Sequence, residues 1–108
     1  MTEAETDDKT ASLLAAIWRR NRPLVEERLA LLERAAVGAA AGARTEELRE
    51  EARGDAHKLA GSLGMYGYDE GTLIARQIEL MLLGDGTPDA ARLGSLVAEL
   101  RRAVFPEA

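Results

Sequence analysis

Apolar residues at helical spacing are the feature that most limits the fold of this chain. In five segments they recur every three or four residues, the spacing that places them on one face of an α-helix. Glycine and proline separate these segments, and no stretch shows the alternation typical of a β-strand. We expect a short helix around residues 13–18, followed by four longer helices that start near residues 23, 45, 69 and 88.

The short connections between these helices predict an all-α fold. We expect the four longer helices to run up-down-up-down as a four-helix bundle, with the short extra N-terminal helix packed across one end. Residues 1–9 are polar and acidic, so we expect them to form an acidic flexible tail. Residues 10–108 would then form the helical bundle domain.

Several helix ends carry their own signals. Pro23 is typical of a first helical turn, and we expect the second helix to begin there. Thr45 is placed to cap the third helix, and Gly67 to end it. Asp69 or Thr72 could cap the fourth helix. The last helix begins with a cap, a first-turn proline and an acid, which are Thr87, Pro88 and Asp89.

Charge and composition limit the class of function. The net charge of −5 argues against nucleic acid as the main partner, because a phosphate backbone requires a basic surface. The chain has no cysteine, which excludes disulfides and thiolate metal sites and fits a reducing compartment. No apolar run approaches about 18 residues, and no signal peptide pattern is present. We therefore expect a cytoplasmic monomer that does not bind membranes.

The only histidine of the chain lies on a helix face that is rich in glycine. Gly54 lies one turn before His57, Gly61 one turn after it and Gly64 two turns after it. The opposite face is apolar. Each glycine inside a helix costs about 0.5–1 kcal/mol relative to alanine. The glycines therefore indicate that another surface approaches this helix, either a neighbouring helix or a docking partner that needs access to the imidazole.

This region resembles a histidine-containing phosphotransfer (HPt) domain of bacterial two-component phosphorelays. The local match spans about residues 53–79 and rests on the stretch Ala56–Gly64, on Gly67, and on the following helix with Ala75, Ile78 and Glu79. Many members carry a lysine three residues after the histidine, where this chain has Ala60.

The resemblance implies that His57 accepts a phosphoryl group from a receiver-domain aspartate or a hybrid histidine kinase, and passes it to another receiver. It implies a phosphotransfer intermediate without autokinase activity or nucleotide binding. It also implies that the chain needs no cofactor, because Mg²⁺ would be bound by the partner receiver domain.

The residues themselves are compatible with this chemistry. A histidine side chain titrates near pH ~6.5, so a neutral imidazole is available as a nucleophile at neutral pH. The nearest cations, Lys58 and Arg53, are candidates for stabilising the phosphate, and Gly61 and Gly64 for giving access to His57. Arg76 and Gln77 on the fourth predicted helix are more remote candidates.

Other chemistry has less support in the sequence. There is no second histidine for a metal site and no Walker-type phosphate-binding sequence. We expect no second catalytic group beside His57. Because the usual lysine is replaced by Ala60, one alternative stays open: a non-catalytic helical interaction or dimerisation module, that is, a degenerate HPt-like adaptor.

Overall fold

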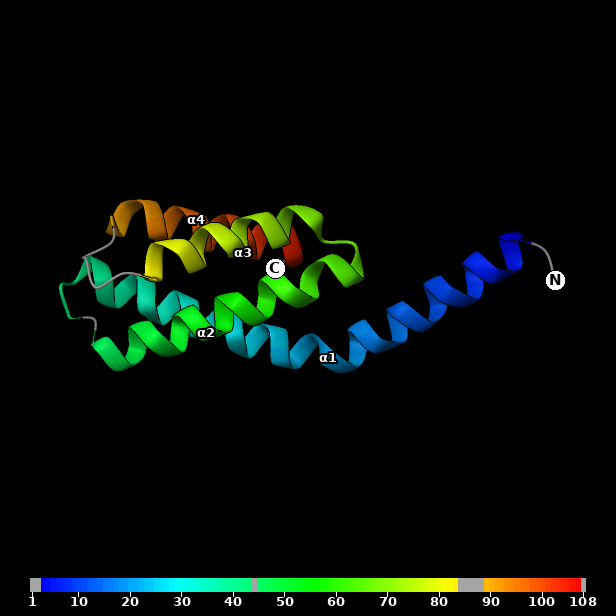
Figure 1. The fold of residues 1–108 in the computed structure, drawn as a ribbon, viewed down its shortest axis with the longest axis horizontal. Helices are drawn as coiled ribbons and strands as arrows, with labels where there is room; N and C mark the ends of the chain where they lie inside the picture. Colours follow the sequence, from blue (N-terminus) through cyan, green and yellow to red (C-terminus); the bar gives the residue numbers. More distant parts are fainter. Residues whose placement is uncertain (1–2, 44, 84–88, 108) are drawn as a thin grey trace.

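The chain folds into a bundle of antiparallel helices, the first of which extends well beyond the others (Figure 1). The structure is a computed structural model that describes residues 3–43, 45–83 and 89–107, with side chains from Asp8 onward. The described part measures 57 × 24 × 20 Å. Its elements are α1 (Glu3–Ala40), α2 (Glu46–Ser62), the short 3₁₀ helix η1 (Leu63–Tyr66), α3 (Asp69–Leu82) and α4 (Ala90–Val104).

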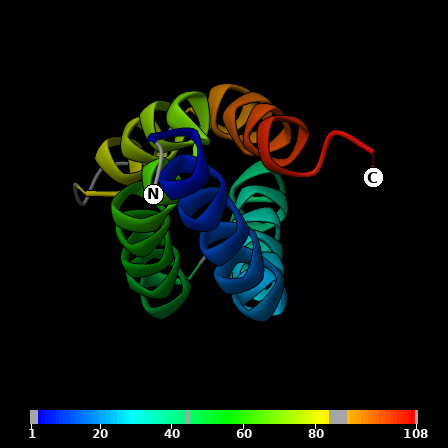
Figure 2. The same ribbon diagram turned by 90° about the vertical axis from the view of Figure 1, so that its right-hand side faces the viewer.

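The four helices form a ring around one core. Helix α1 contacts α2 and α4, and α3 contacts the same two helices from the other side (Figure 2). Successive helices run in opposite directions, which confirms the predicted up-down-up-down bundle. The pair α2–α3 therefore lies across the bundle from the groove between α1 and α4.

The core is built mainly from aliphatic side chains, because the sequence offers few aromatic ones. Each fully buried Leu or Ile stabilises the fold by about 1.5–3 kcal/mol relative to an exposed position. All four helices, η1 and the residue after α4 contribute. The largest fully buried side chains are Leu29, Leu32, Leu59, Leu63, Ile78, Leu82, Leu93, Leu96, Leu100 and Phe105.

The first two predicted helices are one continuous helix, so the prediction of a separate short N-terminal helix was wrong. Pro23 lies inside α1, although a proline in a helix interior costs about 3 kcal/mol. Contacts on its N-terminal side offset this cost. Trp18 packs against the rings of Tyr66, Tyr68 and Phe105, with ring centroids 5.2, 5.0 and 6.0 Å apart. These contacts hold the part of α1 before the proline against the bundle, and the buried side chains of Val25 and Leu29 hold the part after it.

Helix α1 also begins earlier than predicted. It starts at Glu3, inside the segment that we expected to be a tail. The N-terminal part of α1 extends past the turn between α2 and α3 (Figure 1). Ala11, Leu14 and Ala15 of this part line a hollow together with Tyr66 and Tyr68. The flexibility of this acidic segment, and the domain boundary at residue 10, stay predictions.

Two of the predicted helix ends are confirmed. The side-chain oxygen of Thr45 accepts a hydrogen bond from the backbone N–H of Leu48, at 3.0 Å. Gly67 has φ +89°, the left-handed conformation that favours glycine. It ends the 3₁₀ turn η1 that continues α2, whereas the α-helix itself ends at Ser62. Both signals are local, which explains why sequence reasoning found them.

The other predicted caps differ. Tyr68 precedes α3 without a side-chain cap, so neither Asp69 nor Thr72 caps this helix. Asp69 instead lies in its first turn, where its charge suits the helix dipole. Asp89 is itself the cap of α4 and accepts a hydrogen bond from the N–H of Arg92. The predicted contributions of residues 87 and 88 lie outside the described residues.

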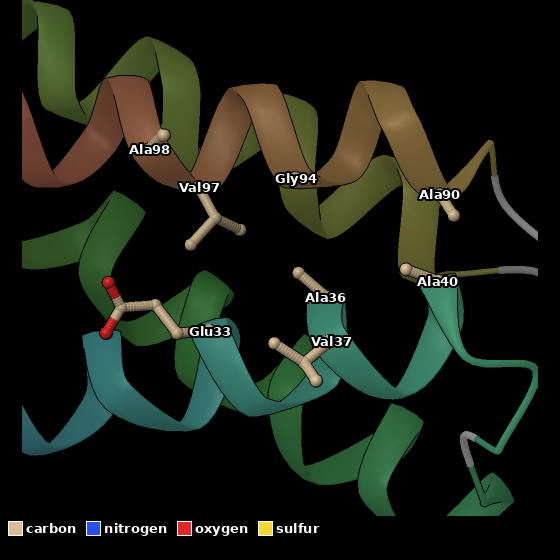
Figure 3. A pocket seen from close by; sticks show the side chains of 8 residues that line it. All are labelled: Glu33, Ala36, Val37, Ala40, Ala90, Gly94, Val97 and Ala98. Carbon is tan, nitrogen blue, oxygen red and sulfur yellow. The ribbon is translucent and has the colours of Figure 1, made fainter.

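A shallow apolar groove lies between the C-terminal part of α1 and the start of α4 (Figure 3). It is lined mostly by small residues, which are Ala36, Val37, Ala40, Ala90, Gly94, Val97 and Ala98, with Glu33 at one end. This groove lies across the bundle from α2–α3. Within the described part of the chain, no helix is both long enough and apolar enough to cross a membrane.

Candidate functional site

His57 lies at the surface of α2, on a helix that the core holds firmly. Its side chain is 72% exposed, whereas Ala56 and Leu59 of the same helical turn are fully buried. The amphipathic pattern of α2 therefore fixes the backbone and leaves the imidazole in solvent. The predicted exposure of this histidine is confirmed.

Glu79 of α3 holds one nitrogen of this imidazole. Its Oε2 lies 2.8 Å from Nδ1 of His57, and its side chain is 21% exposed. An ionised carboxylate can only accept hydrogen bonds, so Nδ1 carries the proton and donates it. In the neutral ring the other nitrogen, Nε2, then has a free electron pair. We expected no second catalytic group beside His57, and the structure places the carboxylate of Glu79 in hydrogen-bond contact with it.

The helical hairpin contains the signal that would have identified Glu79. His57 lies ten residues before Gly67 and Glu79 lies twelve after it. Because α2 and α3 run antiparallel from this turn and each residue rises about 1.5 Å, the two positions are almost level. Glu79 lies on the neighbouring helix α3, so helical spacing along α2 alone does not indicate it.

The glycines around His57 have different surroundings. A Cβ atom added at Gly54 or Gly61 would have no neighbouring atom within 4 Å. At Gly64 it would lie 3.3 Å from the side-chain oxygen of Thr72, which is tight. Gly64 therefore allows α3 to approach closely, whereas Gly61 leaves open space next to His57.

The two predicted cations lie on different sides of α2. Arg53 is half-buried and donates a hydrogen bond to Glu50, at 3.2 Å. Lys58 lies in the hollow between α1 and α2, together with Asp55 and Leu31. Burial raises the pKa of Asp55, while the charges of Lys58 and Arg28 act in the opposite direction. Lys58 therefore faces α1, whereas His57 faces α3.

The two remote candidates on α3 also differ. The side-chain oxygen of Gln77 accepts a hydrogen bond from Arg92 of α4, at 3.2 Å, so Gln77 faces away from α2. Arg76 is exposed and lies three residues before Glu79. It forms no ion pair with any residue that the structure describes. Among the described residues, no three His, Asp or Glu side chains come together in a group that could hold a metal ion.

Comparison with known proteins gives one match. A family model described as Hpt domain matches residues 20–104, a range that contains His57, Glu79, all of α2, α3 and α4, and α1 from residue 20 onward. The chain matches no curated protein and no solved structure.

Proposed function

Because this chain belongs to the Hpt domain family, whose members are phosphotransfer intermediates in phosphorelays, we propose that His57 is its phosphoacceptor. It takes the phosphoryl group from an aspartyl phosphate of a receiver domain, or from a kinase, and passes it to another receiver. The observation that supports this assignment most strongly is an exposed imidazole whose Nδ1–H is held by Glu79. This hydrogen bond leaves Nε2 as the nucleophile.

The transfer uses only groups at the surface. The electron pair of Nε2 attacks phosphorus, the P–N bond forms, and the P–O bond to the receiver's aspartate breaks. The aspartate leaves as a carboxylate. The phosphorylated ring keeps its proton on Nδ1 and so gains positive charge, which the carboxylate of Glu79 stabilises at 2.8 Å. Transfer to a second receiver reverses these steps.

The chain itself needs to supply no cofactor in this proposal. Most stabilisation of the transferring phosphoryl group comes from Mg²⁺ and cations in the receiver's site. The contribution of α2 is access, since the receiver's aspartate must reach Nε2 closely. The open space beside Gly61 provides this access. Arg53, one helical turn before His57, adds only positive charge that it shares with Glu50.

Transfer from a labelled receiver tests the assignment directly. The wild-type chain, incubated with a ³²P-labelled phospho-receiver and Mg²⁺, should take up label that is acid-labile and stable in base. His57→Gln should take up none while its circular dichroism spectrum stays that of the wild type, because the side chain is exposed. Uptake of label by His57→Gln at the wild-type rate would disprove the assignment.

A size series at Gly61 separates access from reactivity. Gly61→Leu should slow transfer from the receiver at least about tenfold, since a branched side chain beside the imidazole blocks close approach. Gly61→Ala should have a smaller effect. Phosphoramidate, a small phosphoryl donor, should still phosphorylate both variants at the wild-type rate.

Gly94→Leu is the matched control. Gly94 also lies inside a helix with nothing within 4 Å of an added Cβ, but in the groove across the bundle (Figure 3). This variant should transfer normally. Equal transfer by Gly61→Leu and Gly94→Leu would refute the role of Gly61.

A further inference from the structure

A phosphoryl group on His57 would stand in surroundings that are short of positive charge. The side chain that contacts the imidazole is the carboxylate of Glu79, at 2.8 Å. Arg53 already shares its charge with Glu50. Lys58 lies in the α1–α2 hollow, away from α3. A further cation near Nε2 would therefore stabilise the phosphorylated state.

Two contacts fix how the neighbouring helices α2 and α3 are aligned. Glu79 lies against His57, and Thr72 lies against Gly64. Both contacts follow the same antiparallel register. In that register, position 76 lies level with Ala60, between the two contacts and one helical turn from His57.

The surface between position 76 and His57 is open. Ala60 is only 7% exposed and ends in a methyl group, so it places no long side chain over this surface. The adjacent Gly61 has no side chain and nothing within 4 Å of where a Cβ would stand. A long side chain from α3 can therefore cross this gap without displacing another residue.

Arg76 has the right position and chemistry to fill this role. It is three residues before Glu79, so the two side chains are neighbours on the surface of α3. Its exposed guanidinium has no ion-pair partner in the described part of the chain. A guanidinium presents donors in a fixed fork that matches two phosphate oxygens. Gln77, the next residue, is directed to Arg92 of α4.

We propose that Arg76 is a further catalytic residue, whose guanidinium donates hydrogen bonds across Gly61 to two non-bridging oxygens of the phosphoryl group on Nε2 of His57. This inference rests on the proposed function of His57. It forms and breaks no covalent bond, and the transfer itself proceeds as described above. Charge that binds the phosphoryl group on this chain raises the rate of uptake and shifts the phosphoryl equilibrium away from the receiver.

The experiment measures both quantities for Arg76→Ala, Arg76→Lys and a matched control. The control is Arg34→Ala, which removes the same charge from an exposed position on α1, beside the α1–α2 hollow. Single-turnover transfer from a ³²P-labelled phospho-receiver gives the rate, and the final distribution of label gives the equilibrium constant. Loss of a bidentate charge-assisted contact should lower each by about tenfold in Arg76→Ala, and by about threefold in Arg76→Lys.

The outcomes separate this proposal from the proposed function. The role of Arg76 is supported if the transfer rate and the equilibrium constant both fall in Arg76→Ala, while both stay within about twofold of the wild-type values in Arg34→Ala. If both variants take up and retain label as the wild type does, Arg76 has no such role while His57 remains the acceptor. If the wild type takes up no label from any phospho-receiver, the proposed function itself fails. A purely structural role of Arg76 would lower the melting temperature and leave the equilibrium constant unchanged.

Discussion

Removing the carboxylate of Glu79 should slow phosphotransfer without unfolding the bundle. Glu79→Ala removes the acceptor that holds the proton on Nδ1 of His57, at 2.8 Å. A hydrogen bond to a charged group contributes about 1.5–3 kcal/mol, and the lower end applies here because His57 is 72% exposed. A loss of about 1.5 kcal/mol in the transition state corresponds to about a tenfold lower rate.

The assay is single-turnover transfer from a phosphorylated receiver, followed by rapid quenching. Glu79→Gln keeps an oxygen that can accept a hydrogen bond from Nδ1–H, so its transfer rate should fall only about threefold. Glu99→Ala removes an exposed carboxylate from α4 and serves as the control. If Glu79→Ala transferred at the rate of Glu99→Ala, the hydrogen bond would have no part in orienting or activating the imidazole.

Three further predictions concern stability. Gly54→Ala should raise the free energy of unfolding in urea by about 0.5–1 kcal/mol, because an added Cβ meets no atom; a decrease would contradict the open space found there. The raised pKa of Asp55 means that the folded state holds its proton more tightly than the unfolded state, so stability falls as pH rises above about 3.8. Asp55→Asn should therefore be more stable than the wild type at pH ~7 and lose this advantage below pH ~3.5. If the difference in free energy of unfolding between the two proteins were the same at both pH values, the effect of burial would be contradicted. Arg101→Met should cost about 1–2 kcal/mol at neutral pH, since Arg101 bonds Glu26 and Glu33 of α1, both at 2.7 Å. Arg101 lowers the pKa of Glu26, so this loss should shrink as pH falls below about 4.5, and equal losses at both pH values would contradict the ion pair.

The fold was predictable because its signals are local and repeated. Apolar residues every three or four positions define the helices, and the cap at Thr45 and the left-handed Gly67 depend on a few neighbouring residues. The prediction of a helix start at Pro23 was wrong because proline is only a local signal, and contacts with residues far along the chain keep the helix continuous. The rings that hold Trp18 come from residues more than 40 positions away.

The candidate site was predictable only as far as it lies on one helix. His57 and the open side at Gly61 follow from the spacing along α2. Glu79 and Arg76 belong to α3, and their relation to His57 depends on how two helices align. That alignment is set by the turn at Gly67 and by the close contact between Gly64 and Thr72. The alignment of α2 and α3 follows from the number of residues that separate each position from Gly67.

The nitrogen that carries the phosphoryl group tests the central claim most directly. The sequence contains one histidine, so a ¹H–¹⁵N spectrum of the imidazole region reports on His57 alone. After phosphorylation by a receiver, the spectrum should show phosphorus coupled to Nε2, with Nδ1 still protonated and bonded to Glu79. Phosphorylation at Nδ1, or label on the protein without any change in this imidazole, would contradict the account.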